Sequence, residues 1–187
     1  MKSKFLIIII AIVTVSNLAF SQSKPLTKKQ LAKSVEYIVS NHIRLVSKGK
    51  EFNMYNIKLS NVVSLFGKPK QIKKDKSEID DQIYTTYTYE SGEIVFNHHG
   101  GVDNWEINKP GWSCIFKVND KITQAFSISS NLADVKKTFP RSWAANKRTD
   151  ILAIYLITPN RTPVDPAIVF GIKNNHITFI SYFVDES

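Results

Sequence analysis

The residues that could bind a metal gather in one short stretch. His98, His99 and Asp103 bring two imidazoles and a carboxylate close together in the chain. Adjacent histidines on an extended chain point to opposite sides, so a site would need a distorted turn and a ligand from elsewhere. Gly100-Gly101 permits such a turn, but no His-x-x-x-His or Cys-x-x-Cys pattern accompanies it. We therefore predict a polar hairpin tip, with no metal site and no cofactor.

The single cysteine is the next candidate, as a thiol nucleophile. Cys114 lies between Trp112 and Phe116, neighbours that are typical of a half-buried strand in which cysteine behaves as a small apolar residue. The chain also has no Gly-rich phosphate loop, no Gly-x-Ser-x-Gly elbow and no convincing carboxylate pair, and Asp80-Asp81 is interpreted as a charged loop. We therefore predict no catalytic residue.

Aromatic and basic residues give the stronger functional signal. Strand alternation should turn some of the tyrosines and tryptophans between positions 84 and 112 toward an open sheet face, where such rings are enriched at protein contacts. The alternative is that most of them seal the core. The lysines at 68, 70, 73, 74 and 76 form the densest basic run, whose simplest interpretation is a solvated loop beside a strand. The predicted binding residues are Tyr84, Tyr87, Tyr89, Trp105, Trp112, Lys70, Lys73 and Lys74.

We expect at least two of those five aromatic side chains to be exposed together on the open side of one sheet. If all five are buried, the surface to consider instead surrounds Trp143, Lys147 and Arg148.

The N-terminal segment predicts export. Lys2 and Lys4 precede an apolar stretch from Phe5 to Val15. Ala19-Phe20-Ser21 then fits a small-x-small cleavage site. The apolar run is shorter than the roughly 20 residues that span a bilayer, so residues 1–21 are predicted to be a cleaved signal peptide. The expected protein is periplasmic or secreted, with no stable membrane anchor.

Composition and charge narrow the class of partner. The chain has 187 residues, 43% of them hydrophobic, which is typical of a globular protein of one domain or two small ones that share a core. Of the 25 basic and 16 acidic residues, the first 21 positions hold two lysines and no acid, which leaves 23 basic residues and a net charge of +7. Outside the cytoplasm, such a surface is expected to bind an acidic protein or envelope polymer rather than nucleic acid.

The first element that the sequence predicts is a helix. Thr27-Lys28-Lys29-Gln30 is a capping box, and apolar residues recur at helical spacing from Leu31 to Leu45. We assign residues 22–56 to an N-terminal helix and a linker.

The rest of the chain shows internal similarity. Short apolar patterns recur at offsets of 73 and 74: Leu59, Val62 and Phe66 match Leu132, Val135 and Phe139, and Ile94-Val95-Phe96 matches Ile168-Val169-Phe170. Each half predicts a short helix with one apolar side, followed by antiparallel strands. The predicted strands are Gln82–Glu90, Glu93–Asn97, Val102–Ile107, Trp112–Val118, Lys121–Ile128, Asp150–Thr158, Ala167–Lys173 and His176–Val184.

The predicted fold class is therefore α+β. The N-terminal helix precedes two similar units, residues 57–128 and 129–187, each a short helix packed on an antiparallel sheet.

The motif Leu65-Phe66-Gly67-Lys68-Pro69 precedes the Tyr-rich strand Tyr84 to Tyr89 and a hairpin. This combination resembles the β-lactamase-inhibitor-protein-like superfamily, which includes small outer-membrane-assembly lipoproteins. The resemblance covers roughly Ile57 to Phe183. It implies two helix-plus-sheet units side by side, in an envelope or secreted protein that binds other proteins.

The predicted function is a non-catalytic protein-binding module, of the inhibitor or immunity type or an envelope-assembly accessory. The alternative is an envelope-glycan binding protein or hydrolase that uses the basic run and the aromatic residues. An inhibitor should bind a purified protein tightly and should not bind glycans, whereas a glycan-binding protein should be retained on cell-wall material.

Overall fold

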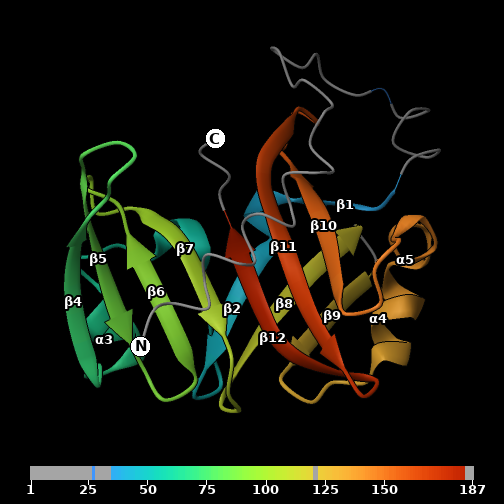
Figure 1. The fold of residues 1–187 in the computed structure, drawn as a ribbon, viewed down its shortest axis with the longest axis horizontal. Coiled ribbons are helices and arrows are strands. Elements are labelled where there is room, and N and C mark those ends of the chain that lie inside the picture. The colour runs from blue at the N-terminus through green and yellow to red at the C-terminus, as the bar shows by residue number, and fades with distance from the viewer. Residues whose placement is uncertain (1–26, 28–34, 120–121, 184–187) are drawn as a thin grey trace.

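The protein is built mostly from β-strands. Its structure, a computed structural model, describes Thr27 and residues 35–119 and 122–183. This part is 51% strand and 17% helical, so the predicted α+β fold class of two helix-on-sheet units is wrong. The strands form one eight-stranded and one four-stranded sheet, with three short α-helices beside them (Figure 1).

The large sheet has the strand order β4-β5-β6-β7-β12-β11-β10-β1. All neighbouring strands are antiparallel except β1, which pairs with β10 in parallel. Its strands are β4 (Gln71–Lys76), β5 (Ile83–Thr88), β6 (Gly92–Phe96), β7 (Val102–Ile107), β12 (His176–Phe183), β11 (Pro163–Lys173), β10 (Ile151–Ile157) and β1 (Tyr37–Val39).

The two similar triplets occupy corresponding strands. Ile94-Val95-Phe96 lies on β6 and Ile168-Val169-Phe170 on β11, and each of these is the middle strand of three consecutive antiparallel strands. Ile94 lies opposite Trp105 and Ile168 opposite Tyr182, while Trp105 and Tyr182 lie opposite each other. Because β7 pairs with β12, the strands from the two halves of the chain form one continuous sheet rather than two.

The small sheet corrects the prediction for the N-terminal region. It has the order β3-β2-β8-β9, made of β3 (Lys50–Asn53), β2 (Ile43–Ser47), β8 (Trp112–Asn119) and β9 (Ile122–Ser127). Residues 37–47 form β1, the 3-10 turn η1 (Ser40–His42) and β2, not the predicted helix. The burial of Ile43, Leu45 and Ser47 alternates with exposed Arg44 and half-buried Val46, a period of two that the helical interpretation missed. The predicted signal peptide and residues 28–34 of that helix lie outside the described residues.

The three α-helices are short and lie on one side of the large sheet. They are α3 (Val62–Phe66), α4 (Leu132–Thr138) and α5 (Pro140–Ala145), and a second 3-10 turn, η2 (Met54–Asn56), precedes α3. Asn131 caps α4 by accepting a hydrogen bond from Ala133 N at 2.8 Å. α4 ends just before Pro140, and Pro140 begins α5, because proline suits the first helical position, where its missing N–H is not needed.

The core lies between the large sheet and the layer formed by the small sheet and the helices. Phe116 of β8, Phe126 of β9, Phe139 at the end of α4 and Phe170 of β11 form a cluster with ring centroids 5.4 to 6.4 Å apart. At the other end, Phe66 of α3 contacts Phe52 of β3, Trp112 of β8 and Tyr89, the residue after β5. Within the described residues, the small sheet and the helices cover only one face of the large sheet (Figure 1).

Candidate functional site

The structure buries most of the aromatic residues that were predicted to form a binding surface. Tyr89, Trp105 and Trp112 are 8%, 1% and 6% exposed. Tyr87 is half-buried and meets Phe96 edge to face, with centroids 5.6 Å apart. The expectation that at least two of the five rings share the open face is therefore wrong.

The register of the strands explains the burial of these rings. Tyr87 lies opposite Ile94, and Ile94 lies opposite Trp105, so all three side chains are on the covered face. Tyr89 lies two positions after Tyr87, so its side chain is on the same face. Tyr84 has the opposite parity and is the one of the five on the open face.

The lysine run forms a strand at the edge of the large sheet, not a loop. β4 pairs with β5 on one side only, and all six of its residues are exposed (Figure 1). Its lysines are partly neutralised nearby: Lys73 lies 2.7 Å from Asp75 and Lys76 lies 2.6 Å from Asp81. Lys70, just before the strand, pairs with Glu90. Among the described residues, Lys74 has no acidic partner within ion-pair distance.

Three isoleucines beside these lysines are the most exposed large apolar side chains of the described chain. Ile72 is 53%, Ile79 91% and Ile83 54% exposed. All belong to β4, β5 or the connection between them, which we call the β4–β5 hairpin (71–88). Since Ile83 is exposed and Thr85, on the same face, is buried, the second layer ends between these two residues.

Hydrogen bonds connect the residues at the tip of the hairpin. The Ser77 hydroxyl accepts a hydrogen bond from Ile79 N at 3.2 Å, and Asp80 Oδ1 accepts one from Gln82 N at 3.2 Å. Tyr84 donates its hydroxyl hydrogen to Asp80 Oδ2 at 2.7 Å. The Ser77 and Tyr84 hydroxyls lower the pKa of Asp80 below its ordinary value. The loop thus presents Ile79 to solvent beside these hydrogen bonds.

The open face of the same sheet carries two carboxylates on neighbouring strands. Glu93 of β6 lies directly opposite Glu106 of β7, an arrangement that places the two Cβ atoms roughly 5 Å apart. Burial, together with the charge of Glu106, raises the pKa of the Glu93 carboxyl. Asn108 donates a hydrogen bond to Glu106 Oε1 at 2.8 Å. The sequence alone did not reveal this pair, because it depends on which residues of two strands face each other.

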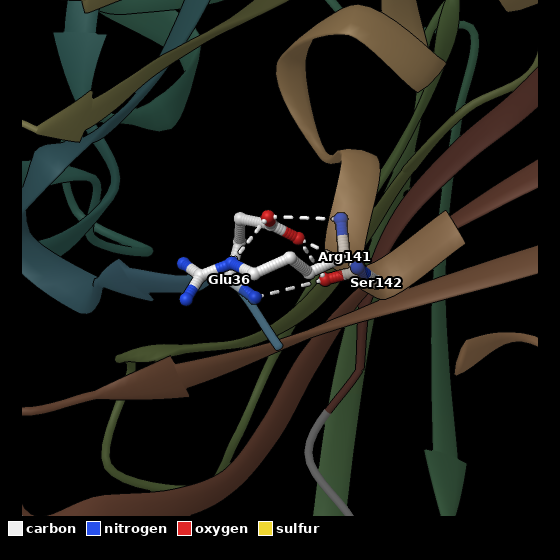
Figure 2. A network of polar contacts seen from close by, with 3 residues as sticks. All are labelled: Glu36, Arg141 and Ser142. Atoms are coloured by element: carbon white, nitrogen blue, oxygen red, sulfur yellow. Dashed lines mark hydrogen bonds and ion pairs between the residues drawn. The ribbon is translucent and has the colours of Figure 1, made fainter. Parts of the chain in front are cut away.

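A third polar cluster joins Glu36 to the start of α5 (Figure 2). Glu36, next to β1, is 7% exposed, and its carboxylate accepts hydrogen bonds from Arg141 N, Arg141 Nε, Ser142 N and Ser142 Oγ at 2.6 to 3.0 Å. Burial by itself would raise the pKa of Glu36, but these hydrogen bonds outweigh it and lower the pKa to about 2. The chain thereby fixes its N-terminal strand to the start of α5.

The residues considered for metal or thiol chemistry lie apart from these clusters. Cys114 is fully buried on β8, and burial raises its thiol pKa well above the ordinary value. His98 and His99 are exposed at the turn between β6 and β7, as the polar hairpin tip was expected to be. In the described part of the chain, no three histidine, cysteine, aspartate or glutamate side chains are grouped so that they could hold a metal ion.

In the described residues, the strands form a mostly β, two-layer arrangement in which one face of the large sheet is open and the β4–β5 hairpin is exposed at its edge. No helix among the described residues has the length and apolar character needed to cross a membrane. Comparison with known proteins adds no relative: no family model matches the chain, and no curated protein or solved structure matches it.

Proposed function

We propose that this protein is an exported, non-catalytic protein-binding module and that the β4–β5 hairpin is its contact surface. The observation that carries the proposal is the concentration of Ile72, Ile79 and Ile83, the three most exposed large apolar side chains of the described chain, on this one hairpin. Apolar side chains gathered on a surface and surrounded by charge mark contact sites. Either an inhibitor or immunity protein or an envelope-assembly accessory would use such a surface.

Four of the residues predicted to bind lie on this surface or directly beside it. Lys70, Lys73 and Lys74 accompany β4, and Tyr84 lies on β5. The lysines would chiefly speed association with an acidic partner, because charges at the rim of an interface act on the rate of encounter. The other predicted binding residues, Tyr87, Tyr89, Trp105 and Trp112, contribute to the core instead.

Site-specific cross-linking tests the proposal. A photoreactive phenylalanine analogue at position 79 should give a covalent adduct with one specific protein in the producing cells, because this side chain is 91% exposed at the hairpin tip. The same analogue at position 155 is the matched control, since Tyr155 is also exposed but lies on β10 in the other half of the sheet. Identical adducts from both positions, or none from position 79, would refute the hairpin as the contact surface.

Export can be tested separately on the same preparation. If residues 1–21 are a cleaved signal, the protein recovered from the envelope or the medium begins at Gln22. Recovery of an intact N-terminus from the cytoplasm would contradict export.

A second candidate function, glycan binding or hydrolysis, is favoured by the Glu93–Glu106 pair. Glycoside hydrolysis uses two neighbouring carboxyl groups, one of which acts as the general acid with a raised pKa, and Glu93 has a raised pKa opposite Glu106. Release of soluble fragments from purified cell-wall glycan, abolished by Glu93→Gln, would support this candidate. Equal release by the wild-type and variant proteins would exclude a role for the pair.

A further inference from the structure

The backbone of β4 offers hydrogen-bonding groups that nothing in the described structure uses. Ser77 N donates to Gln82 O at 2.8 Å, which fixes the hydrogen-bonded pairs of the hairpin. Such pairs alternate along an antiparallel ladder, and β4 and β5 pair without a register shift, so Lys73 and Asp75 bond to β5. The N–H and C=O groups of Ile72, Lys74 and Lys76 therefore point away from β5.

We infer that β4 accepts an extended acidic segment of the partner protein as an additional strand of the sheet. This inference rests on the proposed function and specifies how the partner binds. An exposed edge strand is a template for another strand, and proteins use such edges for peptide recognition. The main chain would supply most of the hydrogen bonds, and side chains on β4 would select the partner.

The side chains of β4 decide which strand fits. Ile72, Lys74 and Lys76 share the face of the sheet that bears Tyr87, because each lies opposite a residue of β5 on that face. Ile72 is half exposed there, so an apolar side chain on the incoming strand would bury its surface. Within the described chain Lys74 has no acidic partner, so a carboxylate on the incoming strand would supply the opposite charge directly across from it.

A second copy of this chain fits the same edge poorly. Antiparallel pairing of two β4 strands about Lys74 would place the two Lys74 residues opposite each other and add both Lys76 residues on the same face. Like charges directly opposite across strands are destabilising. Lysine on an edge strand is also a common protection against self-pairing. The charges therefore favour an acidic strand over a β4 dimer.

The probe for this inference is a synthetic peptide, Thr-Glu-Thr-Glu-Thr-Val-Thr, which in antiparallel register places glutamates opposite Lys76 and Lys74 and valine opposite Ile72. Amide hydrogen exchange of the whole exported protein is followed with and without it. At a peptide concentration about ten times its Kd, exchange at Ile72, Lys74 and Lys76 should slow about tenfold, because about a tenth of the edges remain unoccupied. A peptide with lysine in place of both glutamates should have no effect.

Two variants at one position separate backbone pairing from charge. Lys74→Pro removes an N–H that does not bond to β5, so the hairpin persists and Lys73 and Asp75 stay protected from exchange, while the peptide effect is lost. Lys74→Ala keeps that N–H and should only weaken the effect.

Three results would overturn the inference: unchanged exchange at Ile72, Lys74 and Lys76 with the acidic peptide, an equal response to the lysine peptide, or a β4-dependent dimer in sedimentation without peptide.

The cross-linking experiment distinguishes the two proposals. If the adduct from position 79 persists in Lys74→Pro, strand addition fails while the protein-binding function stands. If the peptide protects the edge but position 79 gives no adduct, the proposed contact surface fails instead.

Discussion

At the scale of single residues, Glu36 shows how one buried charge can be accommodated. An isolated carboxylate would be costly to bury, but this one accepts four hydrogen bonds, two of them from backbone N–H groups of α5. Its pKa is about 2 in the folded protein against an ordinary value of 4.5. A lowered folded-state pKa means that the charged form stabilises the fold. This stabilisation is complete above about pH 4.5 and is lost as the pH falls toward 2.

Glu36→Gln should therefore lower the free energy of unfolding by about 2 kcal/mol at pH 7, because it weakens hydrogen bonds to a charged group. The difference from wild type should shrink between pH 5 and pH 2, which urea unfolding across that range will measure. Glu51→Gln is the matched control, since Glu51 forms an exposed ion pair with Arg44 at 3.8 Å. Its effect should stay below about 0.5 kcal/mol. A difference for Glu36→Gln that is the same at pH 2 and pH 7 would contradict this account.

At the scale of elements, two glycines permit close contacts within the large sheet. A Cβ atom on Gly92 of β6 would lie 1.9 Å from the backbone oxygen of Glu106 on β7. A Cβ atom on Gly171 of β11 would lie 2.1 Å from the ring of Phe179 on β12. The first obstacle is the backbone of a paired strand, whereas the second is a half-buried ring that can turn aside.

Gly92→Ala should therefore lower the free energy of unfolding by about 3 kcal/mol and Gly171→Ala by about 1 kcal/mol. The difference arises because the backbone that the first Cβ atom meets is more rigid than the ring that the second one meets. Urea denaturation of the two variants measures both values. Phe179→Ala added to Gly171→Ala should abolish the clash and give a favourable coupling energy in a double-mutant cycle. The explanation fails if Gly171→Ala proves the more harmful change or if the cycle shows no coupling.

At the scale of the whole molecule, the two halves of the chain share a sheet and a core. Main-chain pairing of β7 with β12 joins them, and the cluster of Phe116, Phe126, Phe139 and Phe170 ties the small sheet and α4 to β11. Shared pairing and shared packing favour a single cooperative transition over independent unfolding of two units.

Phe139→Ala should lower the free energy of unfolding by about 3 to 5 kcal/mol, because it truncates a fully buried aromatic side chain. If unfolding is cooperative, native-state hydrogen exchange should show the same decrease for slowly exchanging amides of β6 and of β11. Val63→Ala is the control, since Val63 is 46% exposed on α3 and should change stability little. A decrease confined to β10, β11 and β12 would show that the halves unfold separately.

The sequence by itself determined the features that depend on local patterns. Alternation, turn residues and breakers located the strands from 82 onward to within a few residues, and the start of β11 differs most, at Pro163 rather than the predicted Ala167. The similar triplets on β6 and β11 were found the same way, because short apolar patterns report which side chains a strand must bury. The lysine run was also recognised, but its identity as the edge strand β4 was not, because charged residues alone do not predict a strand.

Only the tertiary structure decided how these pieces combine. Residues 37–47 carry apolar spacings compatible with a helix, and their partners on β10 and β8, far away in the sequence, made them strands. Register likewise decided which face each side chain took, since a shift of one residue moves a whole strand's side chains to the other face. This is why Tyr87 and Trp105 became core residues while Glu93 met Glu106 on the open face. The exposure of Ile72 and Ile83 depended on where the second layer ends, a property of packing between distant elements that no local pattern contains.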